Sequence, residues 1–131
     1  MDRFAIIDVQ TRRHRWIELP PLNAEGFTFF VSWAQNDTQL AFLRYSRELR
    51  VQQLLLVDAT TGAGKVVVEE RADAGWVKWP SGPQTVIFPE GIPGFLLRSN
   101  RSGFFHWYLY DFRGREIRRL THGDFDAGAF V

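Results

Sequence analysis

The sequence predicts an all-β fold built from antiparallel, four-stranded sheets, and three observations carry this prediction. Short runs of apolar, β-branched and aromatic residues recur along the chain, polar turn residues separate them, and one hairpin pattern appears three times. Of the 131 residues, 45% are hydrophobic and 15% aromatic, which is typical of a globular chain and not of a disordered one. We therefore expect one ordinary domain with a core of its own.

The first half of the chain contains an opening hairpin and one complete sheet. Phe4–Val9 and Arg15–Leu19 are expected to form the hairpin, which Pro20 and Pro21 close. Four strands with hairpin connections follow it: Phe27–Trp33, Gln39–Arg44, Gln53–Asp58 and Lys65–Glu70.

The second half predicts another sheet of the same kind. Its expected segments are Gly75–Trp79, the short Gln84–Phe88, and then Phe95–Arg98, His106–Tyr110 and Glu116–Thr121. The final residues, Phe125–Val131, look like the first strand of a further unit.

A repeat relates the two halves. The three hairpins align on Asp8, Asp58 and Asp111, which are 50 and 53 positions apart, and the dipeptide Leu43-Arg44 recurs 54 positions later as Leu97-Arg98. A period of roughly 40–50 residues is that of one blade of a β-propeller. We therefore predict a partial propeller in a single domain, with residues 4–19 ending one blade, 27–70 and 75–121 forming two blades, and 125–131 starting the next.

The aligned aspartates have a local structural explanation. A carboxylate at the end of a strand can accept hydrogen bonds from the backbone N–H groups of its own turn. Gly62 and Gly114 supply the backbone freedom that such turns need. We therefore expect Asp8, Asp58 and Asp111 to be structural turn residues and not catalytic ones.

Composition excludes several classes of partner and cofactor. Sixteen basic and fifteen acidic residues leave a formal charge of +1, so no overall field favours nucleic acid or an anionic membrane. There is no cysteine, and His14, His106 and His122 lack metal-ligand spacing on one element, so we expect neither a metal nor another cofactor. No signal peptide and no apolar run of about 20 residues is recognisable, which predicts a soluble chain and leaves its compartment open.

Three segments of the chain follow a known pattern: SWAQNDTQLAFLRYSRELRVQQLLLVDATTG, GWVKW and GFLLRSNRSGFFHWYLYDFRGREIRRLTHGDFDA. With them, nearly the whole chain, from about Phe4 to Ala127, resembles the N-terminal β-propeller of the dipeptidyl peptidase IV family, the prolyl oligopeptidase-type serine peptidases. Within the last of these segments, the matching positions are Ser99, Arg101, Gly103, His106, Tyr108, Leu109, Tyr110, Gly114 and the run Leu120–Gly123. The resemblance implies a parent with about eight blades, of which this chain carries about two to three.

The resemblance also implies what the parent does. Such enzymes remove N-terminal dipeptides with proline or alanine in the penultimate position; the propeller gates and positions the peptide, and an α/β-hydrolase domain carries serine, aspartate and histidine. The chain has no G-x-S-x-G elbow, so we expect it to hold no catalytic residue and to be no enzyme by itself. Glu69-Glu70 ends a strand and does not match the family's pair of substrate-binding glutamates.

One segment of the chain is a candidate for substrate contact. By the resemblance, the loop with Trp76, Lys78 and Trp79 lies near the extended end of the substrate cavity, although tryptophans on an inner strand also commonly pack between blades. The expected partners are the peptide, the missing blades and the hydrolase domain of the parent. Exposed blade faces and edges also predict self-association, with Phe4–Leu19 and Phe125–Val131 as exchange sites.

Two alternatives to this function stay open. The chain is also compatible with a TolB-like propeller that acts as a protein-interaction scaffold without any peptidase. A small self-contained enzyme is the third hypothesis, for which the sequence offers no pairing of nucleophile and base.

Overall fold

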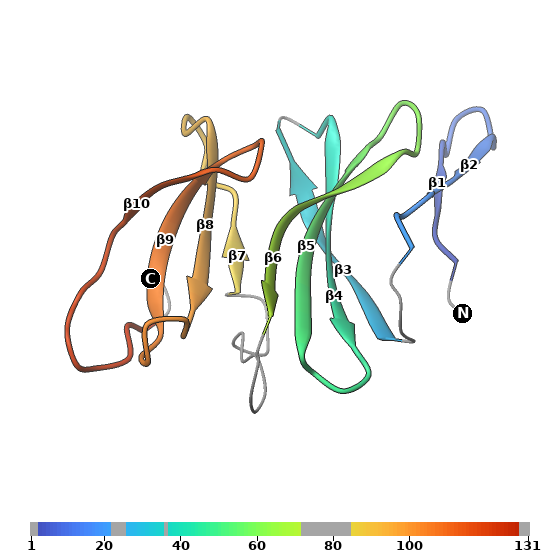
Figure 1. Ribbon diagram of the computed structural model, residues 1–131. Helices are drawn as coiled ribbons and strands as arrows, with labels where there is room; N and C mark the ends of the chain where they lie inside the picture. The colour runs from blue at the N-terminus through green and yellow to red at the C-terminus, as the bar shows by residue number, and fades with distance from the viewer. Residues whose placement is uncertain (1–2, 22–25, 36, 72–84, 129–131) are drawn as a thin grey trace. The chain divides into compact units, whose positions relative to one another are not determined.

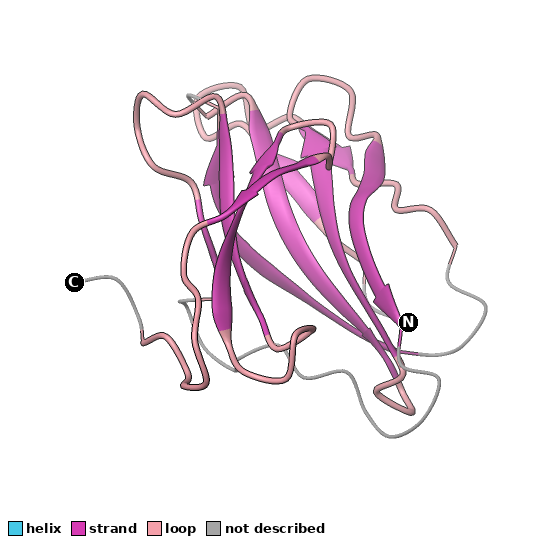
Figure 2. Cartoon of the chain, turned by 60° about the vertical axis from the view of Figure 1, so that its left-hand side comes forward, coloured by secondary structure: helices cyan, strands magenta, loops and turns pink. Residues whose placement is uncertain are grey.

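The computed structural model describes residues 3–21, 26–35, 37–71 and 85–128. Strands, turns and loops account for all of these residues, and none of them lies in a helix (Figure 2). The chain divides into two compact units, Met1–Gly75 and Trp76–Val131, and each is described by itself.

The first unit contains a hairpin and a four-stranded sheet (Figure 1). The hairpin pairs β1 (Ala5–Ile7) with β2 (His14–Trp16), and the strands of the sheet follow in chain order as β3 (Gly26–Ala34), β4 (Gln39–Ser46), β5 (Val51–Asp58) and β6 (Gly64–Arg71). All neighbouring strands of the sheet are antiparallel.

The core of this unit lies between the hairpin and one face of the sheet. Side chains alternate between the two faces of a strand, and on β4 and β5 Leu40, Phe42, Leu55 and Val57 share one face and are buried. Phe4, Ile6, Ile17 and Leu19 of the hairpin segment pack against them, together with Val66 of β6. Burying an apolar side chain of this size contributes about 1.5–3 kcal/mol, so the hairpin is held on the sheet mainly by the hydrophobic effect.

The second unit is a smaller sheet of the same kind, with the order β10-β9-β8-β7. Its strands are β7 (Val86–Ile87), β8 (Gly94–Ser99), β9 (His106–Asp111) and β10 (Glu116–Arg119), again antiparallel. One face carries the stacked rings of Phe95 and Tyr110, whose centroids are 5.3 Å apart. On the other face, the buried residues Leu96 and Trp107 pack with Ala127.

The C-terminal segment differs from the strand that we expected over Phe125–Val131. Residues 125–128 form no strand, and 129–131 lie outside the described residues. The Ala127 N–H instead donates to the Phe105 carbonyl at 2.7 Å, and the Trp107 indole N–H donates to the Gly128 carbonyl at 2.8 Å. Asp126 also accepts a hydrogen bond from the Phe105 N–H at 2.8 Å, so a side chain takes a backbone donor that a regular ladder would use.

The strand registers correct one part of the sequence repeat. Asp58 pairs with Gln39, five positions before Arg44, whereas Asp111 pairs with Gly94, four positions before Arg98. A difference of one residue places a side chain on the other face of the sheet. The Leu-Arg dipeptides are therefore not structurally equivalent. Arg44 shares the face of Leu40 and Phe42, which is the face opposite to Asp58, whereas Arg98 lies on the same face of its sheet as Asp111.

The prediction of an all-β fold with antiparallel, four-stranded sheets is confirmed. The expected strand Gly75–Trp79 lies outside the described residues. Among the residues that the structure does describe, no helix is long and apolar enough to cross a membrane.

Candidate functional site

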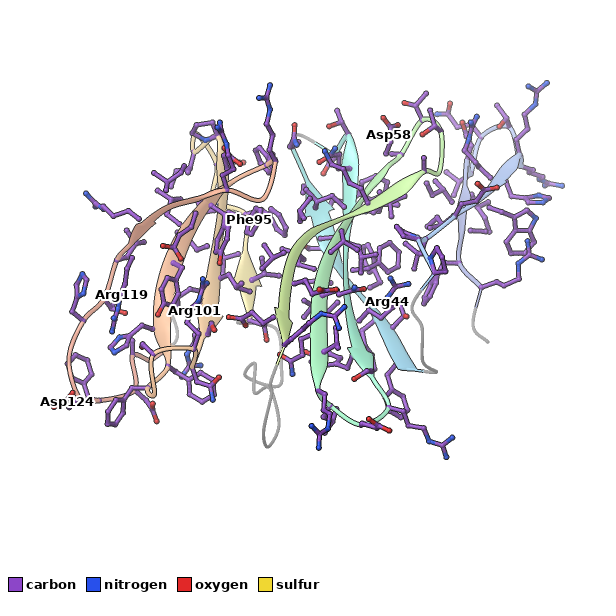
Figure 3. The ribbon with its side chains drawn as sticks, in the orientation of Figure 1. Arg44, Asp58, Phe95, Arg101, Arg119 and Asp124 are labelled. Carbon is purple, nitrogen blue, oxygen red and sulfur yellow. The ribbon has the colours of Figure 1, made fainter. Side chains whose placement is uncertain are left out.

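The three residues that we expect near substrate, Trp76, Lys78 and Trp79, lie outside the described residues. Among the described residues, the features that could matter for function are the aspartate turns, the backbone contact of one hairpin tip and three clusters of polar and aromatic side chains. Figure 3 labels Arg44, Asp58 and Arg101 from these groups.

The first two aspartate turns have the same geometry. Oδ1 of Asp8 accepts hydrogen bonds from the N–H groups of Gln10 and Thr11, at 2.9 and 3.2 Å. Oδ1 of Asp58 accepts from the corresponding N–H groups of Thr60 and Thr61, at 2.7 and 3.1 Å. In each turn the carboxylate satisfies two backbone donors that the hairpin leaves unpaired.

The third turn is one residue shorter. Oδ1 of Asp111 accepts from the N–H groups of Arg113 and Arg115, at 2.9 and 3.0 Å, and Arg115 Nε lies 3.1 Å from Oδ2. The hydrogen bond from the Arg115 N–H is the main cause that lowers the pKa of Asp111. In the first turn, the backbone N–H groups of Thr11 and Gln10 likewise lower the pKa of Asp8.

The tip of the β5–β6 hairpin makes a backbone contact with the residues that follow β2. The Glu18 N–H donates to the Gly62 carbonyl and the Gly64 N–H donates to the Glu18 carbonyl, both at 2.8 Å. A Cβ atom on Gly62 would lie 2.5 Å from the Trp16 carbonyl oxygen, and the residue has φ +78°. Close approach and left-handed backbone therefore both require glycine at this position.

The first hairpin carries Arg12 at the position that Gly62 occupies in the second. Arg12 is left-handed as well, with φ 60°, and it is exposed. Both residues donate their N–H to the carbonyl of the turn's aspartate, at 2.8 Å in each case. The two turns thus share one backbone conformation, but only the second has a tip without a side chain at this point.

A buried arginine joins the first hairpin segment to the sheet. Arg44 is 7% exposed; its Nη1 donates to the Pro20 carbonyl at 2.7 Å, and its Nη2 and Nε both donate to Gln53 Oε1. Gln53 Nε2 in turn donates to Glu69 Oε1 at 2.6 Å. A carboxylate thereby reaches the guanidinium through an amide, and burial lowers the pKa of Arg44.

Both carboxylate oxygens of Glu69 are engaged in this network. Its Oε2 accepts from Arg71 Nε at 2.7 Å, and hydrogen bonds from Arg71 and Gln53 lower the pKa of Glu69. The exposed Arg71 contributes little to stability, because surface ion pairs contribute about 0–1 kcal/mol. Sequence reasoning missed the Arg44 network; the available signal was a charged residue with the same strand parity as Leu40 and Phe42.

His106 is fully buried at the start of β9 and connects it to the segment that follows β10. Its Nε2 lies 2.9 Å from the Gly123 carbonyl, and its Nδ1 lies 2.8 Å from Thr121 Oγ1. A carbonyl can only accept, so Nε2 carries the proton, and in the neutral ring Nδ1 accepts from the Thr121 hydroxyl. Both nitrogens are engaged, so His106 is not free to act as a general base for the neighbouring Ser99.

A second cluster in this unit is centred on Arg101, which follows β8. The Arg101 guanidinium carbon is 3.9 Å from the centroid of the Tyr108 ring, and Arg101 also donates to the Tyr110 hydroxyl and to Glu116 Oε1. The guanidinium carbon of Arg119 lies 5.9 Å from the centroid of the same Tyr108 ring. Cation–π contacts of this kind favour a fixed side-chain arrangement, so this cluster joins the β8–β9 connection, through Arg101, to β9 and β10.

The described residues offer binding and packing groups and no assembled catalytic centre. No group of three or more His, Asp or Glu side chains among them is arranged to hold a metal ion. The aspartates accept backbone hydrogen bonds, and the buried histidine is held on both sides. What the fold and these contacts define is a segment of a blade-built β-propeller.

Comparison with known proteins identifies the family. Residues 3–131 match the family model of the dipeptidyl peptidase IV N-terminal region. The chain belongs to this family, and its fold is that of a partial propeller.

A solved structure supports the same assignment. The chain is similar to dipeptidyl peptidase 4 of Porphyromonas gingivalis, with a TM-score of 0.81 and 25% sequence identity over 97% of this chain. The match spans 18% of the length of that protein. The chain therefore corresponds in fold to part of that protein.

Proposed function

We propose that the chain is a non-catalytic propeller segment of a dipeptidyl-peptidase-IV-like serine peptidase, and that it helps to gate and position the peptide for a hydrolase domain. The observation that supports the proposal is the packing of the first hairpin on one face of the four-stranded sheet. The first hairpin covers the β4–β5 face, and the tip at Gly62 contacts Glu18 through backbone hydrogen bonds. Contacts between neighbouring units are what hold a repeat architecture such as a propeller together.

The whole protein, by this proposal, releases N-terminal dipeptides with proline or alanine in the penultimate position. Trp76, Lys78 and Trp79 are proposed to contact the peptide, since two indoles and an ammonium group can bind an apolar, extended chain and its carbonyl groups. The missing blades and the hydrolase domain are the partners that the proposal requires.

Two measurements test the proposal. The isolated chain should not hydrolyse a Gly-Pro chromogenic substrate, and turnover by it would overturn the non-catalytic role. The whole protein should react with a fluorophosphonate probe for active serine hydrolases and release dipeptides. A whole protein without either property would be a scaffold, and the proposal would be wrong.

The contact residues have a separate test. A proline-containing peptide titrated into the isotope-labelled whole propeller should shift the indole N–H signals of Trp76 and Trp79. Trp79→Ala should weaken this binding, whereas the matched control Trp16→Ala, at a 45% exposed indole on β2, should not. Equal binding by both variants would remove the assigned role of this loop.

A further inference from the structure

The segments that follow β2 and β10 carry the same backbone hydrogen bond. After β2, the Ile17 N–H donates to the Phe4 carbonyl at 2.9 Å, and after β10 the Leu120 N–H donates to the Trp107 carbonyl at 2.8 Å. The two pairs are equivalent in register, because each donor lies nine positions after its turn aspartate and each acceptor lies four positions before it. The third turn is one residue shorter than the first, and the register shift within β10 restores the match.

The next residue in each segment is therefore equivalent as well; it is Glu18 in the first unit and Thr121 in the second. Neighbouring N–H groups of an extended chain point to opposite sides, so both residues direct their N–H away from the strand that pairs with the preceding residue. On that side, the Glu18 N–H donates to the Gly62 carbonyl of the β5–β6 hairpin tip at 2.8 Å. Among the residues that the structure describes, the Thr121 N–H has no hydrogen-bond acceptor.

The carbonyl groups of the two residues differ in their donors. The Glu18 carbonyl accepts from the Gly64 N–H of the hairpin tip at 2.8 Å, whereas the Thr121 carbonyl accepts from Arg119 Nε at 2.8 Å. A carbonyl oxygen has two lone pairs, so the bond from Arg119 leaves room for a second donor. The backbone of Thr121 therefore offers the same donor and acceptor that bind the hairpin tip at Glu18.

We propose that the backbone of Thr121 binds the hairpin tip of the blade that follows this chain in the whole protein. The inference rests on the propeller part of the proposed function. The contact between Glu18 and Gly62 selects this occupant, because it joins the equivalent position of one unit to the hairpin tip of the next sheet along the chain. A tip that approaches so closely needs glycine, since a Cβ on Gly62 would lie 2.5 Å from the Trp16 carbonyl oxygen.

The first test is the sequence of the whole protein beyond this chain. The turn aspartates recur after 50 and 53 positions, so the next hairpin is expected about 50 residues beyond Asp111. The expected result is an aspartate there with a glycine three or four positions later, as at Gly114 and Gly62. Any other residue at this tip position would overturn the proposal.

The second test measures amide hydrogen exchange at Thr121 in the 131-residue chain and in the whole protein. The amide should exchange fast in the chain and at least about tenfold more slowly in the whole protein, because the tip protects it there. The Glu18 amide is the internal control and should be slow in both, since its acceptor lies within the chain. Equal exchange at Thr121 in the two proteins would overturn the proposal. Protection in the chain that grows with its concentration would assign the site to a second copy and would overturn it too.

A pair of variants separates the backbone donor from the side chain. Thr121→Pro removes both the N–H and the hydroxyl, whereas Thr121→Val removes only the hydroxyl, which bonds to His106. In the whole protein, the amides of the following hairpin tip should exchange about tenfold faster in Thr121→Pro than in Thr121→Val. Equal rates in the two variants would contradict the proposal.

The exchange comparison of wild-type Thr121 and Glu18 decides the matter if Thr121→Pro does not fold. None of these readouts depends on peptidase activity. A whole protein without a serine hydrolase would therefore sink the proposed function and still show whether the tip binds at Thr121.

Discussion

The carbonyl oxygen of Pro20 accepts a 2.7 Å hydrogen bond from Nη1 of Arg44, so a buried guanidinium holds the segment after the first hairpin on the sheet. Arg44→Met keeps the length of the side chain but leaves Pro20 and Gln53 without this donor. We expect the free energy of unfolding to fall by about 2–4 kcal/mol, because polar partners of a buried charge become unsatisfied. Urea unfolding monitored by circular dichroism measures the change.

Arg71→Met is the matched control for this variant. Arg71 also bonds to the network, through Glu69, but its side chain is 64% exposed. Its loss should cost no more than about 1 kcal/mol. Equal effects of the two substitutions would show that burial of Arg44 is not what makes its hydrogen bonds matter.

Gly62→Ala should destabilise the chain by more than the backbone conformation alone explains. Its Cβ would lie 2.5 Å from the Trp16 carbonyl and would push the hairpin tip away from Glu18. Gly91→Ala serves as the reference, because Gly91 has φ +75° and no atom within 4 Å of the added Cβ. We expect about 1 kcal/mol for Gly91→Ala and at least about 2 kcal/mol for Gly62→Ala in thermal unfolding. Equal values would mean that the tip contact contributes nothing.

The aspartate turns predict a loss of stability in acid. The folded state lowers the pKa of Asp8 and Asp111, so their stabilising contribution is present above the ordinary carboxyl value of 3.8 and is lost as the pH falls through the lowered pKa. Unfolding free energies measured from neutral pH to about pH 2.5 should therefore decline below about pH 4.

Asp111→Asn tests the origin of this decline. The amide oxygen can still accept from the turn, but it does not titrate, so the slope of stability with pH should become shallower. Adding Asp8→Asn should reduce the slope further, since the two turns are separate. An unchanged slope in the double variant would assign the acid sensitivity to other groups.

His106→Phe should destabilise the second unit. The buried ring would be replaced by one of similar size, but the Gly123 carbonyl would lose its bond to His106 Nε2, and the Thr121 hydroxyl would keep only the hydrogen bond from the Trp107 N–H. We expect a loss of about 1–3 kcal/mol, whereas His122→Ala, at an exposed position, should change stability by less than about 0.5 kcal/mol. Chemical denaturation of the two variants measures this difference, and a neutral His106→Phe would contradict the assigned hydrogen bonds.

Local chemistry explains why most strands and turns were predictable. Continuous runs of apolar and aromatic residues define β4, β5 and β9, and an aspartate before a turn specifies how that turn satisfies its N–H groups. The Arg44 network was not predictable in the same way, because Pro20, Gln53 and Glu69 come together only through the register of the sheet.

The structure differs from the sequence pattern at the Leu-Arg dipeptides and at residues 125–128, for two different reasons. The Leu-Arg dipeptides look equivalent in the sequence. Arg98, however, is one residue closer than Arg44 to the position that pairs with the turn aspartate, so the two arginines lie on different faces relative to that aspartate. The apolar end of the chain suggested a strand, but Asp126 and the Trp107 indole provide side-chain hydrogen bonds that favour an irregular segment there. The loop with Trp76, Lys78 and Trp79 stays a prediction.

The residue four positions after the turn aspartate, Gly62 in one hairpin and Arg12 in the other, determines how closely the hairpin tip can approach a neighbouring segment. At Gly62 a bare backbone allows the tip to lie against a carbonyl oxygen, whereas the Arg12 side chain would collide with a surface approached in the same way. The size of the residue at this position therefore predicts, from the sequence, whether the hairpin tip can approach a neighbouring backbone. Glycine there marks a hairpin whose tip is free to meet its neighbour backbone to backbone, and a larger residue marks a tip that stays apart.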